Sequence, residues 1–205
     1  QVVKPLCELL HPDIEGKPNY DALLTLTNLA SMSDSVRRRI LKERAIPKIE
    51  EYWFMTEHEH LRAAAAELLL NMLFLDEFFK DTVRKGTDRL KLWVLYAAEE
   101  SERLSRCATA AFAILTEDVD ANRRILDEIK SWPEVFQEIA MHEDVESQRR
   151  GLIGIANIME SDEKLCAEIV AAKRALAAAE KFGIIKPTDR EIYERTKHVS
   201  TIPEE

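Results

Sequence analysis

The stretch "LLLNMLFL", Leu68–Leu75, sets one amide, Asn71, inside an otherwise apolar run. The same arrangement occurs 43 residues earlier in "LTLTNLAS", around Asn28, and 86 residues later in "GIANIMES", around Asn157. Because the second separation is twice the first, one unit lies between them, and its equivalent position is Ile114 in "AAFAILTED". A period of this length is typical of solenoids, in which each unit buries its apolar face against its neighbours.

The positions that flank this column share their chemistry in all four units. Six positions before it every residue is small, two before it every residue is apolar, and six after it every residue is acidic. In that order the residues are Ala22, Ala65, Ala108 and Gly151, then Leu26, Leu69, Phe112 and Ile155, then Asp34, Glu77, Asp120 and Glu163. The carboxylates can cap the helix that follows or oppose its positive N-terminal dipole. Each unit is thus predicted to contain a short first helix, a middle helix such as 47–54 and a long third helix such as 61–75.

Three helices in 43 residues match the range of armadillo and HEAT repeats. The sequence therefore predicts an all-α, right-handed superhelical solenoid of about four to five repeats, which forms one domain over residues 1–205. The composition agrees with this fold, since the chain has only five glycines and seven prolines, while 46% of its residues are hydrophobic and 33% are charged.

Charge, cysteine content and hydropathy limit the partners and the cellular compartment that the sequence predicts. The formal charge of −9 argues against nucleic acid as the main partner, because phosphate binding requires a clustered basic surface. Cys7, Cys107 and Cys166 are far apart, which favours reduced, mostly buried thiols in a cytosolic protein. No apolar run reaches the roughly 18 residues of a membrane span, and Gln1–Pro5 does not resemble a signal peptide. We therefore expect a cytoplasmic protein whose partners are neither membrane nor nucleic acid.

The repeat period breaks near the C-terminus. A fifth third-helix should centre near residue 200, yet the segment that looks like one, "AKRALAAAEKFG", occupies 172–183. Either the final unit is truncated, or about 20 residues near Ala171 are absent from the printed sequence. We expect the second, because Ile169–Ala171 begins a first helix that no middle helix follows. The chain also begins without methionine, so we expect it to be a piece of a longer protein.

Catalytic motifs are not recognised in the sequence. Its glycines are sparse and isolated, so no phosphate loop or dinucleotide fingerprint is present. His58 and His60 in "EHEHLRAAAAELLLNML" look like metal ligands, but they occupy a turn that is acidic in the other units. Residues two apart on a helix also face different directions, unlike the pair in an HExxH motif. No catalytic residue, metal site or cofactor is therefore predicted, and the chain is not expected to be an enzyme.

Candidate partner-binding residues lie on the predicted third helices, which line the concave groove of armadillo-type solenoids. Asn28, Asn71 and Asn157 each offer a carbonyl acceptor and an amide donor, the pair that grips an extended peptide. Alternatively, these amides bond to the backbone of an adjacent helix. Residues one and two turns earlier should share the surface, namely Tyr20, Asp21, Leu24, Glu67, Arg106, Arg150 and Ile153. This mixture fits a partially folded protein client better than nucleic acid. Arg149–Arg150 either bind an acidic client segment or form a salt bridge to Glu146 or to a neighbouring turn.

Four long segments, one from each unit, resemble the C-terminal part of the UCS domain of myosin chaperones, the family of the uncoordinated-movement muscle protein and its fungal relatives. They are "LTLTNLASMSDSVRRRIL", "AAAAELLLNMLFLDEFFK", "ATAAFAILTEDVDANRRIL" and "QRRGLIGIANIMESDEKLCAEIV". The segment "AKRALAAAEKFGIIKPTDREIYE" resembles the end of the same family. The resemblance covers nearly the whole chain and departs from the family at the junction near Ala171, where family members look longer.

The resemblance implies a non-enzymatic chaperone or co-chaperone that binds the myosin motor domain in a concave groove and assists its folding and assembly. It implies that a TPR module, a central armadillo region and the first part of the UCS domain lie outside this chain. The TPR module would recruit an Hsp90-type chaperone. Self-association of the full-length protein and a sarcomere-associated position in muscle belong to the same set of expectations.

The alternative function is an armadillo scaffold that joins folded proteins in trafficking or cytoskeletal assembly. A chaperone should prefer an unfolding-prone motor domain and suppress its aggregation. A scaffold should instead bind a folded partner with a defined stoichiometry. The two functions are therefore separable by experiment.

Overall fold

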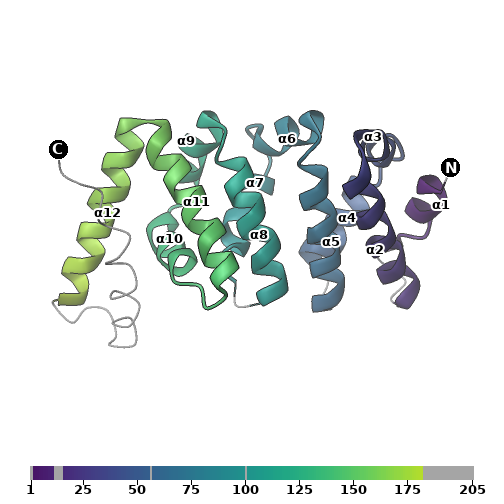
Figure 1. Ribbon diagram of the computed structural model, residues 1–205, viewed down its shortest axis with the longest axis horizontal. Helices are drawn as coiled ribbons and strands as arrows, with labels where there is room; N and C mark the ends of the chain where they lie inside the picture. The colour runs from purple at the N-terminus through teal and green to yellow at the C-terminus, as the bar shows by residue number, and fades with distance from the viewer. Residues whose placement is uncertain (1, 12–15, 56, 100, 182–205) are drawn as a thin grey trace.

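The structure is a computed structural model that describes residues 2–11, 16–55, 57–99 and 101–181. Within these residues every regular element is an α-helix (Figure 1). The helices are α1 (Val3–Glu8), α2 (Lys17–Met32), α3 (Asp34–Lys42), α4 (Ile46–Met55), α5 (Glu59–Met72), α6 (Asp76–Val83), α7 (Arg89–Tyr96), α8 (Glu102–Leu115), α9 (Val119–Glu128), α10 (Trp132–Ala140), α11 (Val145–Ser161) and α12 (Glu163–Lys181).

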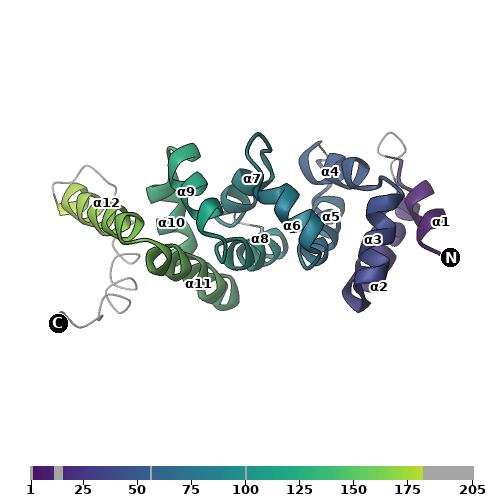
Figure 2. The ribbon, with the colours of Figure 1, turned by 90° about the horizontal axis from the view of Figure 1, so that it is seen from above.

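These helices follow the predicted order of first, middle and third helix. The triplets α3–α5, α6–α8 and α9–α11 form three complete units, α1 and α2 match the last two helices of a unit, and α12 opens another. The third helices α2, α5, α8 and α11 stand side by side in one layer, with the middle helices α4, α7 and α10 behind them (Figures 1 and 2). Figure 2 shows α2 and α11 standing forward of α5 and α8, so the third helices line the inner side of a curve. The predicted all-α armadillo- or HEAT-like solenoid is confirmed.

The apolar and small columns of the repeat form the core. Leu26, Leu69 and Phe112 are buried, and each contributes about 1.5–3 kcal/mol on transfer from water. The small column is buried in every unit, at Ala22, Ala65, Ala108 and Gly151. At its last member even a methyl group does not fit, since a Cβ on Gly151 would lie 2.1 Å from Cγ2 of Ile139. The small residues therefore permit the third helices to pack closely on their neighbours.

The acidic column lies at the start of each first helix. Asp34 and Glu163 are the first residues of α3 and α12, and the other two members of the column lie in the first turns of α6 and α9. The capping hydrogen bond of α9 comes from a different carboxylate, since Asp118 Oδ1 accepts from the Ala121 N–H over 2.8 Å. The column thus acts mainly by opposing the positive end of the helix dipole.

The irregular C-terminal unit is a single helix in the structure. Helix α12 runs from Glu163 to Lys181 and passes through Ala171 without interruption. It joins the expected first helix to most of "AKRALAAAEKFG", whereas residues 182–205 lie outside the described part of the chain. The expectation that about 20 residues are absent near Ala171 stays a prediction. The segments on both sides of Ala171 favour helix, so they can form one continuous helix whether or not such residues are absent.

Candidate functional site

The candidate binding residues lie on α2, α5, α8 and α11, which we call the third-helix row (Figure 1). Each helix of the row contacts the next one. Side chains at equivalent repeat positions therefore come from neighbouring helices and can act together along the row. Their individual contacts decide which of them remain available to a partner.

Asn71 and Asn157 tie neighbouring helices of the row together. Asn71 Nδ2 donates to the Thr27 carbonyl on α2 over 3.0 Å, and Asn157 Nδ2 donates to the Ala113 carbonyl on α8 over 3.1 Å. In both cases the acceptor lies 44 residues earlier in the chain. This geometry is the alternative interpretation of the repeated amides and corrects the peptide ladder, because these two amide groups already donate to the fold. Such a bond contributes about 1 kcal/mol net.

The other two positions of the column differ from this pattern. Asn28 is exposed, and its side-chain amide has no hydrogen-bond partner among the residues that the structure describes. Only its backbone carbonyl is engaged, since it accepts from Ser31 Oγ over 2.8 Å. Ile114 is half-buried and packs against the core. Asn28 is therefore the member of the column whose amide makes no hydrogen bond within the described residues, and its contact with a partner stays a prediction.

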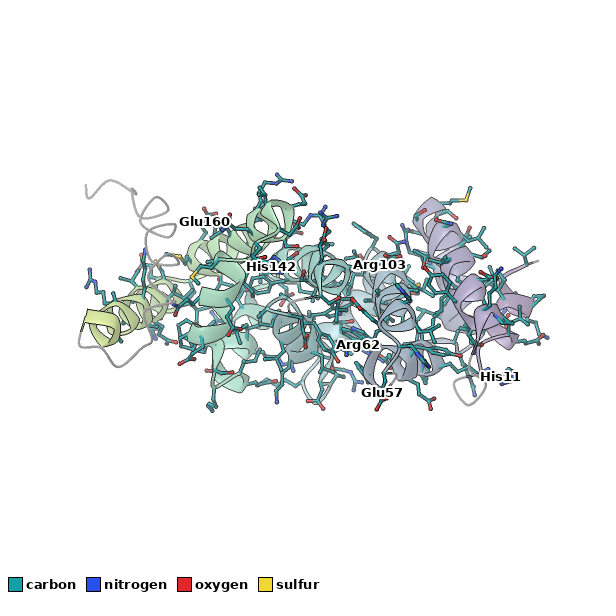
Figure 3. The ribbon with its side chains drawn as sticks, turned by 90° about the horizontal axis from the view of Figure 1, so that it is seen from below. His11, Glu57, Arg62, Arg103, His142 and Glu160 are labelled. Atoms are coloured by element: carbon teal, nitrogen blue, oxygen red, sulfur yellow. The ribbon has the colours of Figure 1, made fainter. Side chains whose placement is uncertain are left out.

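Tyr20 and Glu67 are brought together by a residue that the sequence reasoning missed, Arg103 of α8. Arg103 Nε and Nη2 lie 2.8 and 3.2 Å from the two carboxylate oxygens of Glu67 on α5. Its Nη1 donates to the Tyr20 hydroxyl on α2 over 3.3 Å. We call these three residues the clasp; Figure 3 labels its arginine at the centre of the row. Hydrogen bonding to Glu67 raises the pKa of the Arg103 guanidinium above its usual range.

The sequence repeat contains a signal that could have placed Arg103 on the surface of the row. The residue lies eleven positions before Ile114, which is one helical turn beyond the offsets used to choose the candidates. The residue type at this position changes in each unit, from Lys17 to His60, Arg103 and Glu146. Periodicity alone would therefore have placed it on the surface of the row without revealing its partner.

Arg106 and Arg150 are engaged between α8 and α11. Arg106 Nε and Nη2 lie 3.1 and 2.7 Å from the carboxylate of Asp144, whose Oδ2 also accepts from the Ser147 N–H over 2.8 Å. These bonds hold the pKa of Asp144 well below its usual range. Arg150 Nε lies 2.8 Å from Glu146, and its Nη1 donates to the Arg106 carbonyl over 3.2 Å. Of the two interpretations of Arg150, the structure has the pairing with Glu146.

Apolar side chains remain exposed along the row. Ile153 on α11 is 42% exposed, Met32 at the end of α2 is 75% exposed, and Phe74 just after α5 is 58% exposed. Asp21 is also exposed, whereas Leu24 is half-buried against the core. The row therefore offers a partner exposed apolar side chains together with polar ones, such as Asp21 and the Asn28 amide.

Metal binding and thiol chemistry find no support in the described ranges. No group of three or more His, Cys, Asp or Glu side chains there could hold a metal ion, and His60 instead packs edge-on against Tyr20 at 6.4 Å. Burial raises the pKa of the Cys107 thiol to about 12 and that of Cys7 to about 11, so both stay protonated and unreactive. Of the described helices, none combines the length and the apolar composition needed to cross a bilayer.

Comparison with known proteins gives a consistent relationship. No family model matches the chain. The protein unc-45 homolog B of Danio rerio is 38% identical over 174 residues, which are 83% of this chain and 18% of that protein. The chain thus spans about a fifth of the length of the curated relatives that it matches.

Solved structures show the same relationship in three dimensions. The myosin chaperone UNC-45 from C. elegans, in complex with an Hsp90 peptide, is 66% identical, with a TM-score of 0.81 over 98% of this chain and 22% of that chain. A structure of the same C. elegans chaperone in an alternative conformation is 73% identical, with a TM-score of 0.68 over 87% of this chain and 21% of that chain. The shared repeat register, the solenoid fold and this level of identity lead to one conclusion: the chain belongs to the UNC-45 family of UCS-domain chaperones.

Proposed function

We propose that the chain is the C-terminal part of a UCS domain and acts, without catalysis, as a chaperone segment that binds the myosin motor domain along the third-helix row. The observation that carries this proposal is that three large apolar side chains stay exposed on or next to the row, those of Met32 on α2, Phe74 just after α5 and Ile153 on α11. The C. elegans relative is described as a myosin chaperone and was solved with an Hsp90 peptide, which supports the choice of partner.

The physical basis is the burial of apolar surface. A motor domain that has not completed folding exposes apolar segments, and covering them removes their area from water at about 25 cal/mol per Å². A solenoid offers a long surface for such segments rather than a preorganised reaction centre. The row would shield the client in the cytosol, and at the sarcomere in muscle, while a TPR module outside this chain recruits an Hsp90-type chaperone.

The test is the aggregation of a purified myosin motor domain under mild heating, followed by light scattering with the chain in equimolar amount. A row variant, Phe74→Ser with Ile153→Ser, replaces side chains that are 58% and 42% exposed. A matched control, Leu9→Ser with Val119→Ser, replaces apolar side chains that are 49% and 39% exposed outside the row. Circular dichroism verifies that both variants remain folded. The parent and the control should suppress aggregation, and the row variant should not.

Other outcomes have distinct meanings. Equal loss of suppression in both variants would contradict the placement of the client on the row. No suppression by the parent, together with stoichiometric binding of the folded motor domain, would favour the alternative of a scaffold that joins folded proteins in trafficking or cytoskeletal assembly. Substitution of Asn71 or Asn157 is less suitable for this test, because their amides hold neighbouring helices together.

A further inference from the structure

The junction between α5 and α8 is built differently from the other junctions of the row. Between α2 and α5, and between α8 and α11, side chains bond to backbone carbonyls of the neighbouring helix, as those of Asn71, Asn157 and Arg150 do. Between the α4–α5 pair and the α7–α8 pair, three hydrogen-bonded contacts join side chains to side chains. They link Arg89 to Glu50, Ser101 to Glu59, and Arg103 to Glu67.

The exception in the repeat explains this difference. Ile114 occupies the column in which asparagine bridges the other junctions, and an isoleucine side chain has no hydrogen-bond donor. The main-chain contact made by Asn71 and Asn157 therefore has no counterpart from this column between α8 and α5. Figure 1 shows α5 and α8 diverging toward the end at which α6 lies. The two helices are thus held by side chains near their other end.

Aromatic rings and the clasp provide the contacts on the two faces of this junction. In the layer of middle helices, the Trp53 ring of α4 lies 4.3 Å from that of Trp93 and 5.4 Å from that of Tyr96, both on α7. Apolar contact of this kind is not directional, so the rings can shift against each other without breaking a bond. On the row, the clasp is a partly exposed ion pair, with Arg103 and Glu67 side chains 37% and 27% exposed. Such pairs contribute little to stability and open readily.

We propose that the α5–α8 junction is the hinge of this solenoid, with the Trp53–Trp93 contact as its pivot and the clasp as the latch that sets its angle. The halves that move are α1–α5 and α7–α12. Compared with this chain, the UNC-45 structure with the Hsp90 peptide has a TM-score of 0.81 over 98% of the chain, and the alternative conformation has 0.68 over 87% of it. The inference deepens the proposed function, because the hinge would adjust the spacing between the exposed side chains of Phe74, just after α5, and Ile153 of α11.

Cys107 offers a native probe of the latch. It lies on α8, is 7% exposed, and is close enough to Glu67 and Arg103 for their charges to act on its thiol. Its labelling by a maleimide, resolved by peptide mass spectrometry, should become up to about fivefold faster in Arg103→Met, which is the change expected when a partly exposed ion pair is lost. The control is Arg106→Met, which removes an ion pair between α8 and α11. Cys7, buried in α1, serves as the internal reference.

A distance measurement separates hinge motion from local uncovering of the thiol. Spin labels on cysteines introduced at the exposed positions Asp21 of α2 and Ala156 of α11, in a background with Cys107→Ser and Cys166→Ser, report the span across the junction. We expect the distance distribution to broaden and shift in Arg103→Met and to stay unchanged in Arg106→Met. An unchanged distribution in Arg103→Met, or an equal shift in both variants, would overturn the hinge. Neither result depends on myosin, so the hinge and the proposed function fail independently.

Discussion

Helix α8 has two neighbours in the row, and it is held by them in different ways. Toward α11 the backbones approach so closely that a Cβ on Gly154 would lie 2.5 Å from the Phe112 ring, and the Asn157 amide reaches an α8 carbonyl. Toward α5 the clasp joins side chain to side chain, and in the layer of middle helices the aromatic rings of α4 and α7 pack against each other. The common repeat sets where the helices lie, whereas the individual residues in its columns set how firmly each junction is joined.

The largest expected effect is at the aromatic contact of the α5–α8 junction. Trp53→Ala should lower the free energy of unfolding by about 3–5 kcal/mol, because it empties a fully buried site. Trp132→Ala is the comparison, since that ring is half-buried and pairs with Phe136 at 5.3 Å. Urea unfolding followed by circular dichroism measures both variants. If Trp53→Ala lowers the free energy of unfolding by no more than Trp132→Ala does, the contact made by Trp53 is not the main apolar contact of the junction.

The next effect concerns the close approach of α8 and α11. Gly154→Ala gains about 1 kcal/mol of helix propensity, but its methyl group overlaps the buried Phe112 ring. Since overpacking costs about 1–3 kcal/mol, we expect a net loss in the free energy of unfolding. The double variant Gly154→Ala with Phe112→Leu should lose less than the sum of the single variants, because leucine vacates part of the space. If the losses of the two single variants add up to the loss of the double variant, the two side chains do not compete for the same space.

The sequence predicted the features that depend on repetition. The helices, their order and the apolar column at Leu26, Leu69 and Phe112 recur in each unit, so they can be recognised without knowledge of the distances between helices. The clasp could not be recognised in this way, because Arg103 has a different residue type at its position in each unit. Its role depends on two partners from two other helices, and only the packing of the solenoid brings them together.

The repeated asparagines show a second limit of periodicity. A bridge to an adjacent helix and a grip on a peptide use the same amide donor, so the column at Asn71 and Asn157 is compatible with both functions. The choice depends on whether a carbonyl lies within reach, which the structure answers with Thr27 and Ala113. The exception at Ile114 was visible in the sequence, but its consequence for the α5–α8 junction required the geometry of the neighbouring units.

Removal of one amide bridge should have a smaller effect than either core change. Asn157→Ala should lower the free energy of unfolding by about 1 kcal/mol, since it removes a hydrogen bond to the Ala113 carbonyl and leaves that carbonyl to water. Asn28→Ala provides the matched control, because its exposed amide makes no hydrogen bond within the described residues. The same urea titrations measure both. Similar losses in the two variants would mean that the bridge contributes nothing beyond the intrinsic difference between asparagine and alanine in a helix.

The smallest effect is the contribution of the ion pair between Arg106 and Asp144 to the α8–α11 junction. The pKa of Asp144 in the folded protein lies well below the usual value of an aspartate, chiefly because its carboxylate accepts hydrogen bonds from Arg106. A carboxyl group whose folded-state pKa is lowered stabilises the fold fully above its unfolded pKa, and this contribution is lost as the pH falls through the folded value. The loss should begin below about pH 5 and should be modest, because the Arg106 side chain is 48% exposed and screened by water.

Asp144→Asn isolates this contribution. The asparagine carbonyl can still accept from the Ser147 N–H that caps α11, so the variant loses the charge while keeping the cap. Urea midpoints of the parent and the variant, measured from about pH 7 to pH 3, should therefore differ most near neutrality and converge on acidification. If the difference instead stays constant over the whole range, the charge of Asp144 contributes nothing to the free energy of unfolding. The α8–α11 junction would then be stabilised by the hydrogen bonds to main-chain carbonyls and by the close packing at Gly154. Its contrast with the α5–α8 junction would remain.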